Sequence, residues 1–459
     1  MLGHDWCPPE CRLSALIARA YHRPAMRILH LAWEYPPVLY GGLGRHVHAL
    51  AHAQAEHGHD VIVITQAAGA ETEDSADREP LRPHEAGSVR VLRTGSGPMH
   101  CEPGDLLRQV AEMQGRFEAR GARLLQGWSP QVVHAHDWMV GQAADAVRRE
   151  CGAPLVATIH ATEAGRNRGW IHTDLSTAIH AQEWWLANTA DSVIACSRHM
   201  AAEVDALFGV SAAHVVPNGI TPAQWQRDER AIAEVRAENA DAGVLLAYTG
   251  RVEWEKGVQT LLDAMPRVLE QHPDARLLVA GQGSYLPALQ LQAQWLGLGD
   301  HVRFLGWVSE ERLRAVVAAA DVAVAPSLYE PFGLVALEAA ALGTPLVVAE
   351  TGGLAEFAAD GDVAATFRAG DAGSLAWVLG NDLADEPGRT ERARRASQSV
   401  VDRYSWSRVA ELTVDTYPPD RSAVPAAVGD ARGSSSALHR HLSVPHFDAP
   451  PGQLMDAGW

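Results

Sequence analysis

The chain has 459 residues, 47% of them hydrophobic, and a formal net charge of −18. This length and apolar content are enough for two large cores. The negative charge argues against nucleic acid or an anionic membrane as a partner, and no apolar run approaches the ~20 residues that span a bilayer. Residues 1–25 lack the apolar core of a secretory signal, so we expect a cytoplasmic protein with a dispensable, disordered lead.

The first strand and the loop after it come next in the chain. Met26 precedes an expected strand from Arg27 to Ala32, and a loop containing Gly41 and Gly42 leads into a helix from about Arg45. A glycine turn between a parallel strand and a helix lets backbone approach a phosphate. The loop lacks the G-x-G-x-x-G fingerprint, so it does not indicate a dinucleotide cofactor.

Short apolar runs continue to alternate with helical stretches through the first half. Further strands are expected at Asp60–Thr65, Val89–Arg93, Val132–His136, Leu155–Ile159 and Ser192–Cys196. This alternation predicts a parallel sheet, whose ligands bind beyond the carboxyl ends of the strands. Asp137 and His160 follow two of those ends. A lone histidine is more often a packing or capping residue than a catalytic one, but histidines together with an aspartate favour a functional site.

A second alternating pattern begins at Val244 after a polar run, and it predicts a second doubly wound half. Its expected strands are Val244–Thr249, Arg276–Ala280, Val302–Leu305, Val322–Pro326, Leu346–Ala349 and Val363–Phe367. The simplest architecture is therefore an α/β protein with two Rossmann-like domains that face a central crevice.

Lys256 is the only lysine in the chain. It lies just beyond Arg251, between the end of an expected strand and the start of an expected helix. An ammonium is a compact point charge that can sit between phosphates. The alternative is compositional accident, since a single lysine must stand somewhere.

Two glycines and two aspartates in the second half bear on ligands. Gly281 and Gly283 follow an expected strand, where glycines give a ligand close access to the backbone. Asp360 and Asp362 superficially match an Asp-x-Asp metal motif, but they flank Gly361 in a segment with turn chemistry. We therefore expect no metal site and no cofactor.

The stretch from Ser327 to Glu338 joins an expected strand to an alanine-rich helix. Pro331 stands where a first-turn proline belongs. The amides after it would be free to bind an anion at a helix N-terminus, namely those of Phe332, Gly333 and Leu334. Glu330 in the turn and Glu338 in the helix could both face one crevice. Amides and carboxylates together suit a nucleotide-sugar diphosphate; alternatively, Glu330 caps a turn and Glu338 is a solvated helix residue.

These motifs resemble one known family in combination, the retaining glycosyltransferases of family 4 with the GT-B fold, which are similar to glycogen synthase. The resemblance covers roughly Met26 to Tyr417 and rests on Tyr35-Pro36-Pro37 with Gly41-Gly42, His134-Ala135-His136-Asp137, Thr158-Ile159-His160, Val216-Pro217-Asn218-Gly219, Gly250-Arg251 with Lys256-Gly257, and the pair Glu330 and Glu338. The segments around Trp33 and Thr162 are similar to actinobacterial α-1,4-glucosyltransferases, which build glycogen and polymethylated glucose polysaccharide.

The resemblance implies a domain plan. The acceptor-side domain would comprise residues 26–220 and the nucleotide-sugar domain residues 244–404, joined by a linker at 221–243. Residues 405–417 would form a helix that packs back toward the first domain. Residues 418–459, rich in Pro, Ser, Gly and Ala, are expected to be a disordered tail.

The resemblance also implies roles for single residues. Arg251 and Lys256 would neutralise the donor diphosphate, and Gly41 and Gly42 would lie against its distal phosphate. Glu330 would hold hydroxyls of the transferred sugar and Glu338 those of the ribose. His160 and Asp137 would lie near the reacting sugar. Tyr40 departs from the pattern, because classical bacterial glycogen synthases carry a lysine there, and this leaves ADP-glucose and UDP-glucose both open as donors.

The expected reaction is metal-independent transfer of glucose to an α-1,4-glucan with retention. Two cationic side chains and helix N-termini would stabilise the leaving diphosphate, and no carboxylate stands out as a nucleophile. Three alternatives remain: another family 4 transferase such as a mannosyltransferase, a nucleotide-sugar epimerase, or a catalytically silent glucan-binding protein. The residues leave the acceptor length and the oligomeric state open.

Overall fold

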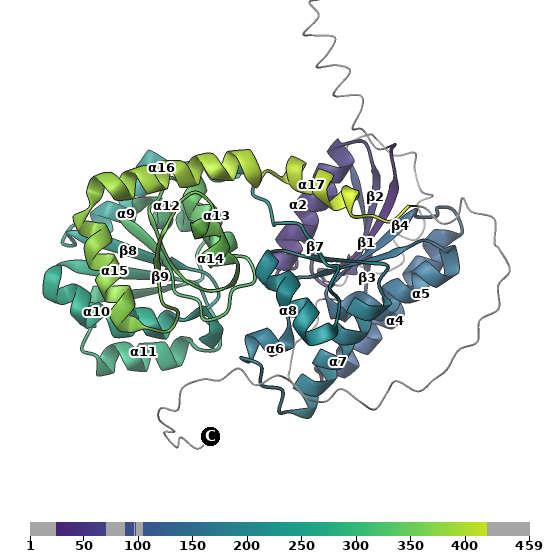
Figure 1. Cartoon of the computed structure of the whole chain (residues 1–459), viewed down its shortest axis with the longest axis horizontal. Coiled ribbons are helices and arrows are strands. Elements are labelled where there is room, and N and C mark those ends of the chain that lie inside the picture. The colour runs from purple at the N-terminus through teal and green to yellow at the C-terminus, as the bar shows by residue number, and fades with distance from the viewer. Residues whose placement is uncertain (1–23, 70–87, 96, 98–103, 420–459) are drawn as a thin grey trace, which may run out of the picture.

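The structure, a computed structural model, describes residues 24–69, 88–95, 97 and 104–419. The described chain forms two α/β domains, each built on a parallel sheet (Figure 1). This confirms the expected fold class. The expected lead and tail fall almost entirely outside the described residues.

The first domain contains a seven-stranded sheet in the order β3-β2-β1-β4-β5-β6-β7. Its strands are β1 (Arg27–Leu31), β2 (Asp60–Gln66), β3 (Val89–Thr94), β4 (Val132–His136), β5 (Leu155–Ile159), β6 (Ser192–Ala195) and β7 (His214–Val215). Its helices are α2 (Gly42–Glu56), α4 (Leu106–Leu125), η1 (Trp138–Val140), α5 (Gly141–Cys151), α6 (Glu163–Arg166), α7 (Asp174–Thr189) and α8 (Arg198–Phe208). The expected strands are confirmed to within a residue at their ends, because buried parallel strands are continuous apolar runs.

The second domain contains a six-stranded sheet in the order β10-β9-β8-β11-β12-β13. Its strands are β8 (Val244–Thr249), β9 (Ala275–Ala280), β10 (Val302–Gly306), β11 (Val322–Ala325), β12 (Leu346–Ala349) and β13 (Ala365–Phe367). Helices and short turns cover it: η2 (Pro222–Gln224), α9 (Glu229–Glu238), η3 (Trp254–Lys256), α10 (Val258–Gln271), α11 (Leu286–Trp295), η4 (Gly299–His301), α12 (Glu310–Ala319), α13 (Leu334–Ala341), α14 (Gly352–Ala359), α15 (Ala372–Ala384) and α16 (Glu386–Arg403).

The polar run at 221–243, which the sequence predicts to be a linker, is partly helical. It contains α9, whose N-cap Asp228 accepts hydrogen bonds from the amides of Arg230 and Ala231. Ile232 and Val235 of α9 are buried in a core of the second domain. Ile232 and Val235 form too narrow an apolar stripe for the sequence composition to indicate a buried helix. In the structure they are enough to pack α9 against the second domain.

The chain returns to the first domain at its described C-terminal end. The helix α16 lies along the second domain and leads into α17 (Trp406–Asp415), which lies beside α2 (Figure 1). Val409, Val414 and Tyr417 are buried in the same core as residues of α2 and β1. The last described segment is therefore part of the first domain's core.

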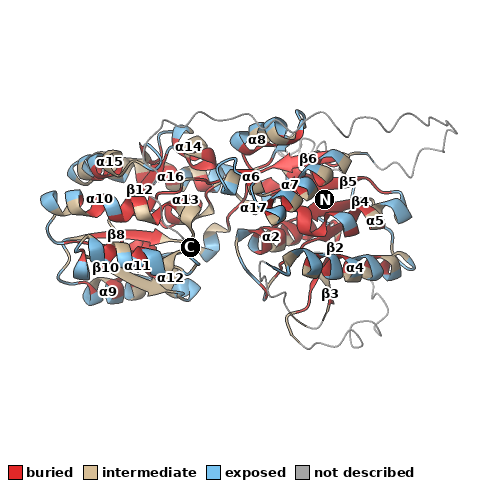
Figure 2. Ribbon diagram, turned by 90° about the horizontal axis from the view of Figure 1, so that it is seen from below, coloured by how far each residue is buried: buried red, intermediate tan, exposed pale blue. Residues whose placement is uncertain are grey.

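In both domains the central strands are buried beneath helices whose outer faces are exposed (Figure 2). The carboxyl ends of both sheets then supply the loops in which ligands of such folds bind. Within the described residues, no helix combines the length and the apolar character needed to cross a membrane.

Candidate active site

Lys256 and Glu330 form an ion pair at the carboxyl ends of the second sheet. Lys256 Nζ lies 2.8 Å from Glu330 Oε2, although the residues are 74 positions apart in the chain. Their side chains are 18% and 11% exposed. The fold thus brings together the two groups assigned to the donor diphosphate and its sugar, and in this structure each neutralises the other.

Arg251 contributes a second cation to this region. Its Nη2 lies 3.1 Å from Glu255 Oε1, and its side chain is half-exposed. The Tyr248 hydroxyl donates a hydrogen bond to the Arg251 carbonyl and so orders the loop. The guanidinium therefore has a partner at the surface while remaining accessible to an anion.

The start of α13 corrects the expected helix boundary. The helix begins at Leu334, so Pro331 and Phe332 precede it and Pro331 is not a first-turn proline. Gly333 is the N-cap and has a φ of 102°, which a side chain would disfavour. The free amides of the first turn therefore begin at Leu334, and the Phe332 side chain packs against both domain cores.

The glycine loop of the first domain is already occupied by a carboxylate. Glu34 Oε2 accepts hydrogen bonds from the amides of Tyr40, at 2.5 Å, and Gly41, at 3.0 Å. Burial raises the pKa of Glu34, and the amides of Tyr40, Gly41 and Gly44 oppose that rise. The Gly41 amide is thus not free for a phosphate. Glu34 was not singled out from the sequence, since nothing local showed that its side chain turns back onto the loop.

Gly42 marks a close approach of the two domains. A Cβ at Gly42 would lie 2.9 Å from Leu334 Cδ1, so the N-termini of α2 and α13 face each other. Close by, Arg45 Nη1 lies 3.7 Å from Glu338 Oε1. Burial raises the pKa of Glu338 to about 7, and Arg45 opposes that rise. The carboxylate assigned to ribose therefore lies at the interface of the domains.

Gly281 and Gly283 are needed for a reason other than the expected access to a ligand. A Cβ at Gly281 would lie 1.8 Å from the Gly250 carbonyl oxygen, and one at Gly283 would lie 2.1 Å from the Val252 carbonyl oxygen. Both glycines therefore allow the loop that carries Arg251 to pack against them. They therefore determine how closely the backbone of that loop can approach.

His160 and Asp137 meet beyond the ends of β4 and β5. The His160 amide donates a hydrogen bond of 2.7 Å to Asp137 Oδ1. Burial lowers the pKa of His160 to about 3 and raises the pKa of Asp137 to about 6. Asp137 has a φ of 62°, an unusual conformation for a non-glycine residue. A neutral imidazole and the carboxylate of a residue with an unusual backbone conformation are thus fixed together at the sheet edge.

The fold also gathers histidines that the sequence reading did not connect. Two groups of three are close enough to share an ion: His30, His134 and His136, and His46, His136 and His160. The sequence reading expected no such cluster. Both ring nitrogens of His30 and of His136 already take part in hydrogen bonds.

Tyr329 also contributes to this region and was missed as a site residue. From the second domain its hydroxyl accepts a hydrogen bond from the Thr162 amide, at 3.2 Å, and donates one to Glu203 Oε1, at 3.0 Å. A Cβ at Gly165 would lie 2.4 Å from its ring. Tyr329 therefore joins the Glu330 turn to the loop that follows His160.

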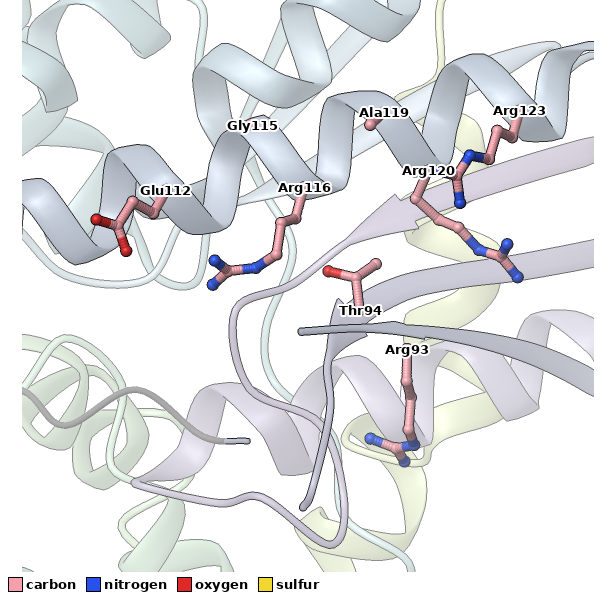
Figure 3. A pocket seen from close by; sticks show the side chains of 8 residues that line it. All are labelled: Arg93, Thr94, Glu112, Gly115, Arg116, Ala119, Arg120 and Arg123. Carbon is pink, nitrogen blue, oxygen red and sulfur yellow. The ribbon is translucent and has the colours of Figure 1, made fainter. Parts of the chain in front are cut away.

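A separate cavity of about 370 Å³ lies between β3 and α4. Figure 3 shows Arg93 and Thr94 on the strand and three arginines on the helix, namely Arg116, Arg120 and Arg123. None of the residues assigned to the transfer site lines this cavity.

Comparison with known proteins agrees with this geometry. Residues 40–224 match the family model described as Glycosyltransferase Family 4, and residues 230–399 match Glycosyl transferases group 1. The chain is 40% identical over 400 residues to glycogen synthase of Mycobacterium tuberculosis H37Rv, covering 85% of this chain and 94% of that protein. It is 30% identical to D-inositol 3-phosphate glycosyltransferase of Xylanimonas cellulosilytica, covering 84% and 93%.

A solved structure, sucrose-phosphate synthase from Thermosynechococcus elongatus, shares the fold with a TM-score of 0.71 at 23% identity. The match covers 85% of this chain and 98% of that one. Together with the two family models, these similarities cover both domains. The chain therefore belongs to the family 4 glycosyltransferases of the GT-B fold and is a hexosyltransferase similar to glycogen synthase.

Proposed function

We propose that the protein transfers glucose from ADP-glucose or UDP-glucose to an α-1,4-glucan with retention at the anomeric carbon. The observation that carries this proposal is the Lys256–Glu330 pair, which holds one cation and one hydroxyl acceptor at the carboxyl ends of the second sheet. The 40% identity to a glycogen synthase supports glucose and a glucan as the substrates.

Donor binding exchanges the partners of this pair. Lys256 and Arg251 contact the diphosphate, and Glu330 accepts hydrogen bonds from hydroxyls of the transferred sugar. In the transfer step the bond from the anomeric carbon to the diphosphate oxygen breaks. The acceptor oxygen bonds to the same face of that carbon, and its proton passes to the departing phosphate oxygen. Negative charge therefore develops beside two fixed cations, an arrangement that lowers the barrier.

His160 and Asp137 act on the sugar side of the transfer. His160 is neutral near pH 7, because burial lowers its pKa to about 3. A neutral imidazole orients a sugar hydroxyl without adding a positive charge next to the cationic transition state. Asp137 holds the His160 backbone through its amide.

The proposed chemistry needs no metal, since two side-chain cations face the leaving group. Activity should therefore be unchanged in excess chelator. Loss of turnover that Mg²⁺ or Mn²⁺ restores would contradict this part of the proposal.

The defining experiment is a panel of donors against a panel of acceptors. ADP-glucose, UDP-glucose and GDP-mannose are tested with maltooligosaccharides and with inositol 3-phosphate, and NMR of fresh product determines the linkage. Transfer of glucose to maltooligosaccharides with a new α-1,4 bond supports the proposal. Mannose transfer, or inositol phosphate as the preferred acceptor, would replace it with another family 4 activity. Donor conversion without acceptor would indicate an epimerase, and glucan binding without turnover a silent protein.

A further inference from the structure

A chain of buried polar side chains connects the described C-terminal end of the protein to His160. Its members are Tyr417 after α17, Gln54 on α2, His30 on β1, His136 on β4, and His160 after β5; we refer to them as the histidine chain. Tyr417, Gln54, His30 and His136 are at most 2% exposed. Polar groups as buried as these need hydrogen-bond partners, so the hydrogen bonds between neighbouring members show which nitrogen of each ring carries the proton.

Each link of the histidine chain has hydrogen-bonding geometry. Gln54 Nε2 donates to the Tyr417 hydroxyl at 2.9 Å, and Gln54 Oε1 lies 2.7 Å from His30 Nε2. His30 Nδ1 lies 3.0 Å from His136 Nε2, and His136 Nδ1 lies 3.2 Å from His160 Nε2. Both ring nitrogens of His30 and of His136, and Nε2 of His160, therefore take part in hydrogen bonds of the histidine chain.

The direction of the hydrogen bonds follows from Gln54. An amide oxygen can only accept, so His30 Nε2 carries its proton and His30 Nδ1 is an acceptor. His136 must then donate through Nε2 and accept at Nδ1. His160 in turn donates through Nε2. Burial lowers the pKa of His30 and of His136, so both rings are neutral and each carries a single proton.

We propose that the histidine chain makes Tyr417, Gln54, His30 and His136 positioning residues, which hold His160 as the Nε2–H tautomer and present its Nδ1 as a hydrogen-bond acceptor. No described residue bonds to that Nδ1. This inference deepens the proposed function, on which it rests for the assignment that His160 contacts the sugar. His160 Nδ1 would then accept a hydrogen bond from a sugar hydroxyl, and it could not donate one to a sugar oxygen.

Tyr417 joins a second branch that favours the same direction. Its hydroxyl lies 3.0 Å from His134 Nδ1, and His134 Nε2 lies 2.7 Å from Thr158 Oγ1. Because the hydroxyl accepts from Gln54 Nε2, its own hydrogen can be donated to His134 Nδ1. All the bonds along both branches can therefore form at once.

Gln54→Met tests the inference, because it keeps a similar volume and removes both hydrogen bonds. His30 Nε2 then has no partner in either tautomer. A buried orphan acceptor is tolerated better than a buried orphan N–H. His30 should therefore move its proton to Nδ1, which reverses the chain and protonates His160 Nδ1. Tyr417→Phe should act in the same direction, because it lets the Gln54 amide turn over.

The first measurement is nitrogen NMR of the full chain labelled at histidine, without substrate, with His160→Ala used to assign the signal. In the wild type, His160 Nδ1 should show the shift of an unprotonated nitrogen. In Gln54→Met and Tyr417→Phe it should move toward the protonated range. Tyr404→Phe is the matched control, a buried tyrosine from the same end of the chain, and should leave the signal unchanged.

The second measurement is steady-state kinetics at saturating acceptor. Gln54→Met and Tyr417→Phe should lower kcat roughly tenfold or more with little change in KM, because a wrong histidine tautomer can be very costly to catalysis. A fall in kcat with an unchanged His160 signal would reduce the chain to a structural role and overturn the inference. Stoichiometric metal bound to the purified protein at His30, His134 and His136 would also overturn it.

These readouts separate the inference from the proposed function. If His160→Ala keeps normal activity, the assigned sugar contact of His160 is wrong, whatever the NMR signal shows. If the wild-type signal shows Nδ1 protonated, the histidine chain runs in the other direction and the inference fails, whatever the substrates prove to be.

Discussion

The Lys256–Glu330 ion pair determines how substitution of Lys256 affects activity and stability. Lys256 in isolation is a turn lysine that buries little apolar surface. In the fold it neutralises a mostly buried carboxylate at 2.8 Å. Removing the lysine therefore affects both the reaction and the stability of the folded protein.

Lys256→Ala should lower kcat by a factor of roughly 10²–10³, as is typical when one electrostatic group facing a transition-state charge is removed. It should also lower the free energy of unfolding by about 1–3 kcal/mol, since Glu330 loses its partner. Kinetics and urea unfolding measure the two effects. The double variant with Glu330→Gln should recover stability but not activity, and recovery of activity would refute the assigned role.

Glu338 predicts a pH dependence of nucleotide binding. Its pKa is raised to about 7, so the carboxylate is mostly ionised at pH 8 and mostly protonated at pH 6. If only the ionised form accepts the ribose hydroxyls, the Kd of a nucleoside diphosphate should rise roughly tenfold from pH 8 to pH 6. Calorimetry measures this, and Glu338→Gln should remove the carboxylate's part of the dependence. A pH profile identical in Glu338→Gln would contradict the assignment.

The same shift has a consequence for stability, with the opposite sign. The folded-state pKa of Glu338 lies above the ordinary value of 4.5, so the folded protein takes up this proton more readily than the unfolded chain. Its contribution therefore falls as the pH rises from about 4.5 to about 7. Ionisation of Glu338 therefore strengthens nucleotide binding but lowers the stability of the folded protein.

At the scale of elements, short turns hold the donor loops in place through glycine. Gly257 ends η3 and caps α10 with a φ of 71°, and a Cβ there would lie 1.9 Å from the Pro326 carbonyl oxygen. Gly343 follows α13 with a φ of 69° and has open space around it. The two positions share a backbone conformation and differ in their surroundings.

Gly343→Ala should therefore lower the free energy of unfolding by roughly 1–2 kcal/mol, the usual cost of a left-handed conformation. Gly257→Ala should cost clearly more, because the strand end carrying Pro326 must also move. Thermal unfolding of the two variants isolates the difference. Equal losses would show that the contact with Pro326 does not constrain the turn.

At the scale of the whole molecule, the domains meet through polar contacts around α8. Glu356 of α14 accepts hydrogen bonds from the amides of Arg198, at 3.1 Å, and His199, at 2.5 Å. The Ser197 hydroxyl donates to the Pro331 carbonyl oxygen at 2.7 Å. The free N-terminus of a helix in one domain is thus satisfied by a carboxylate of the other.

Glu356→Ala should loosen this contact and raise the population of open molecules roughly tenfold or more, since hydrogen bonds to a charged group contribute about 1.5–3 kcal/mol. X-ray scattering should show a larger radius of gyration, and the donor KM should rise. Glu350→Ala is the control, because Glu350 is exposed and bonds to Thr366 within the second domain. An unchanged radius in Glu356→Ala would show that other contacts hold the domains together.

The sequence by itself determined the two Rossmann-like domains and nearly all of the strands, and it predicted which residues lie on the donor side. Buried parallel strands are continuous apolar runs, and glycines and charged residues in the intervening loops are visible within a few positions. The only lysine and the turn at Glu330 could be assigned by such local patterns, with the family resemblance supplying their roles.

Only the tertiary structure decided which of these groups meet. Lys256 and Glu330 are 74 positions apart, and Gln54 and Tyr417 are 363 apart, so no local pattern relates them. The carboxylate of Glu34 on the glycine loop and the docking of α9 likewise depend on burial. Hydrogen-bond partners are chosen by the need to satisfy polar groups that packing removes from water, and that need exists only once the chain is folded.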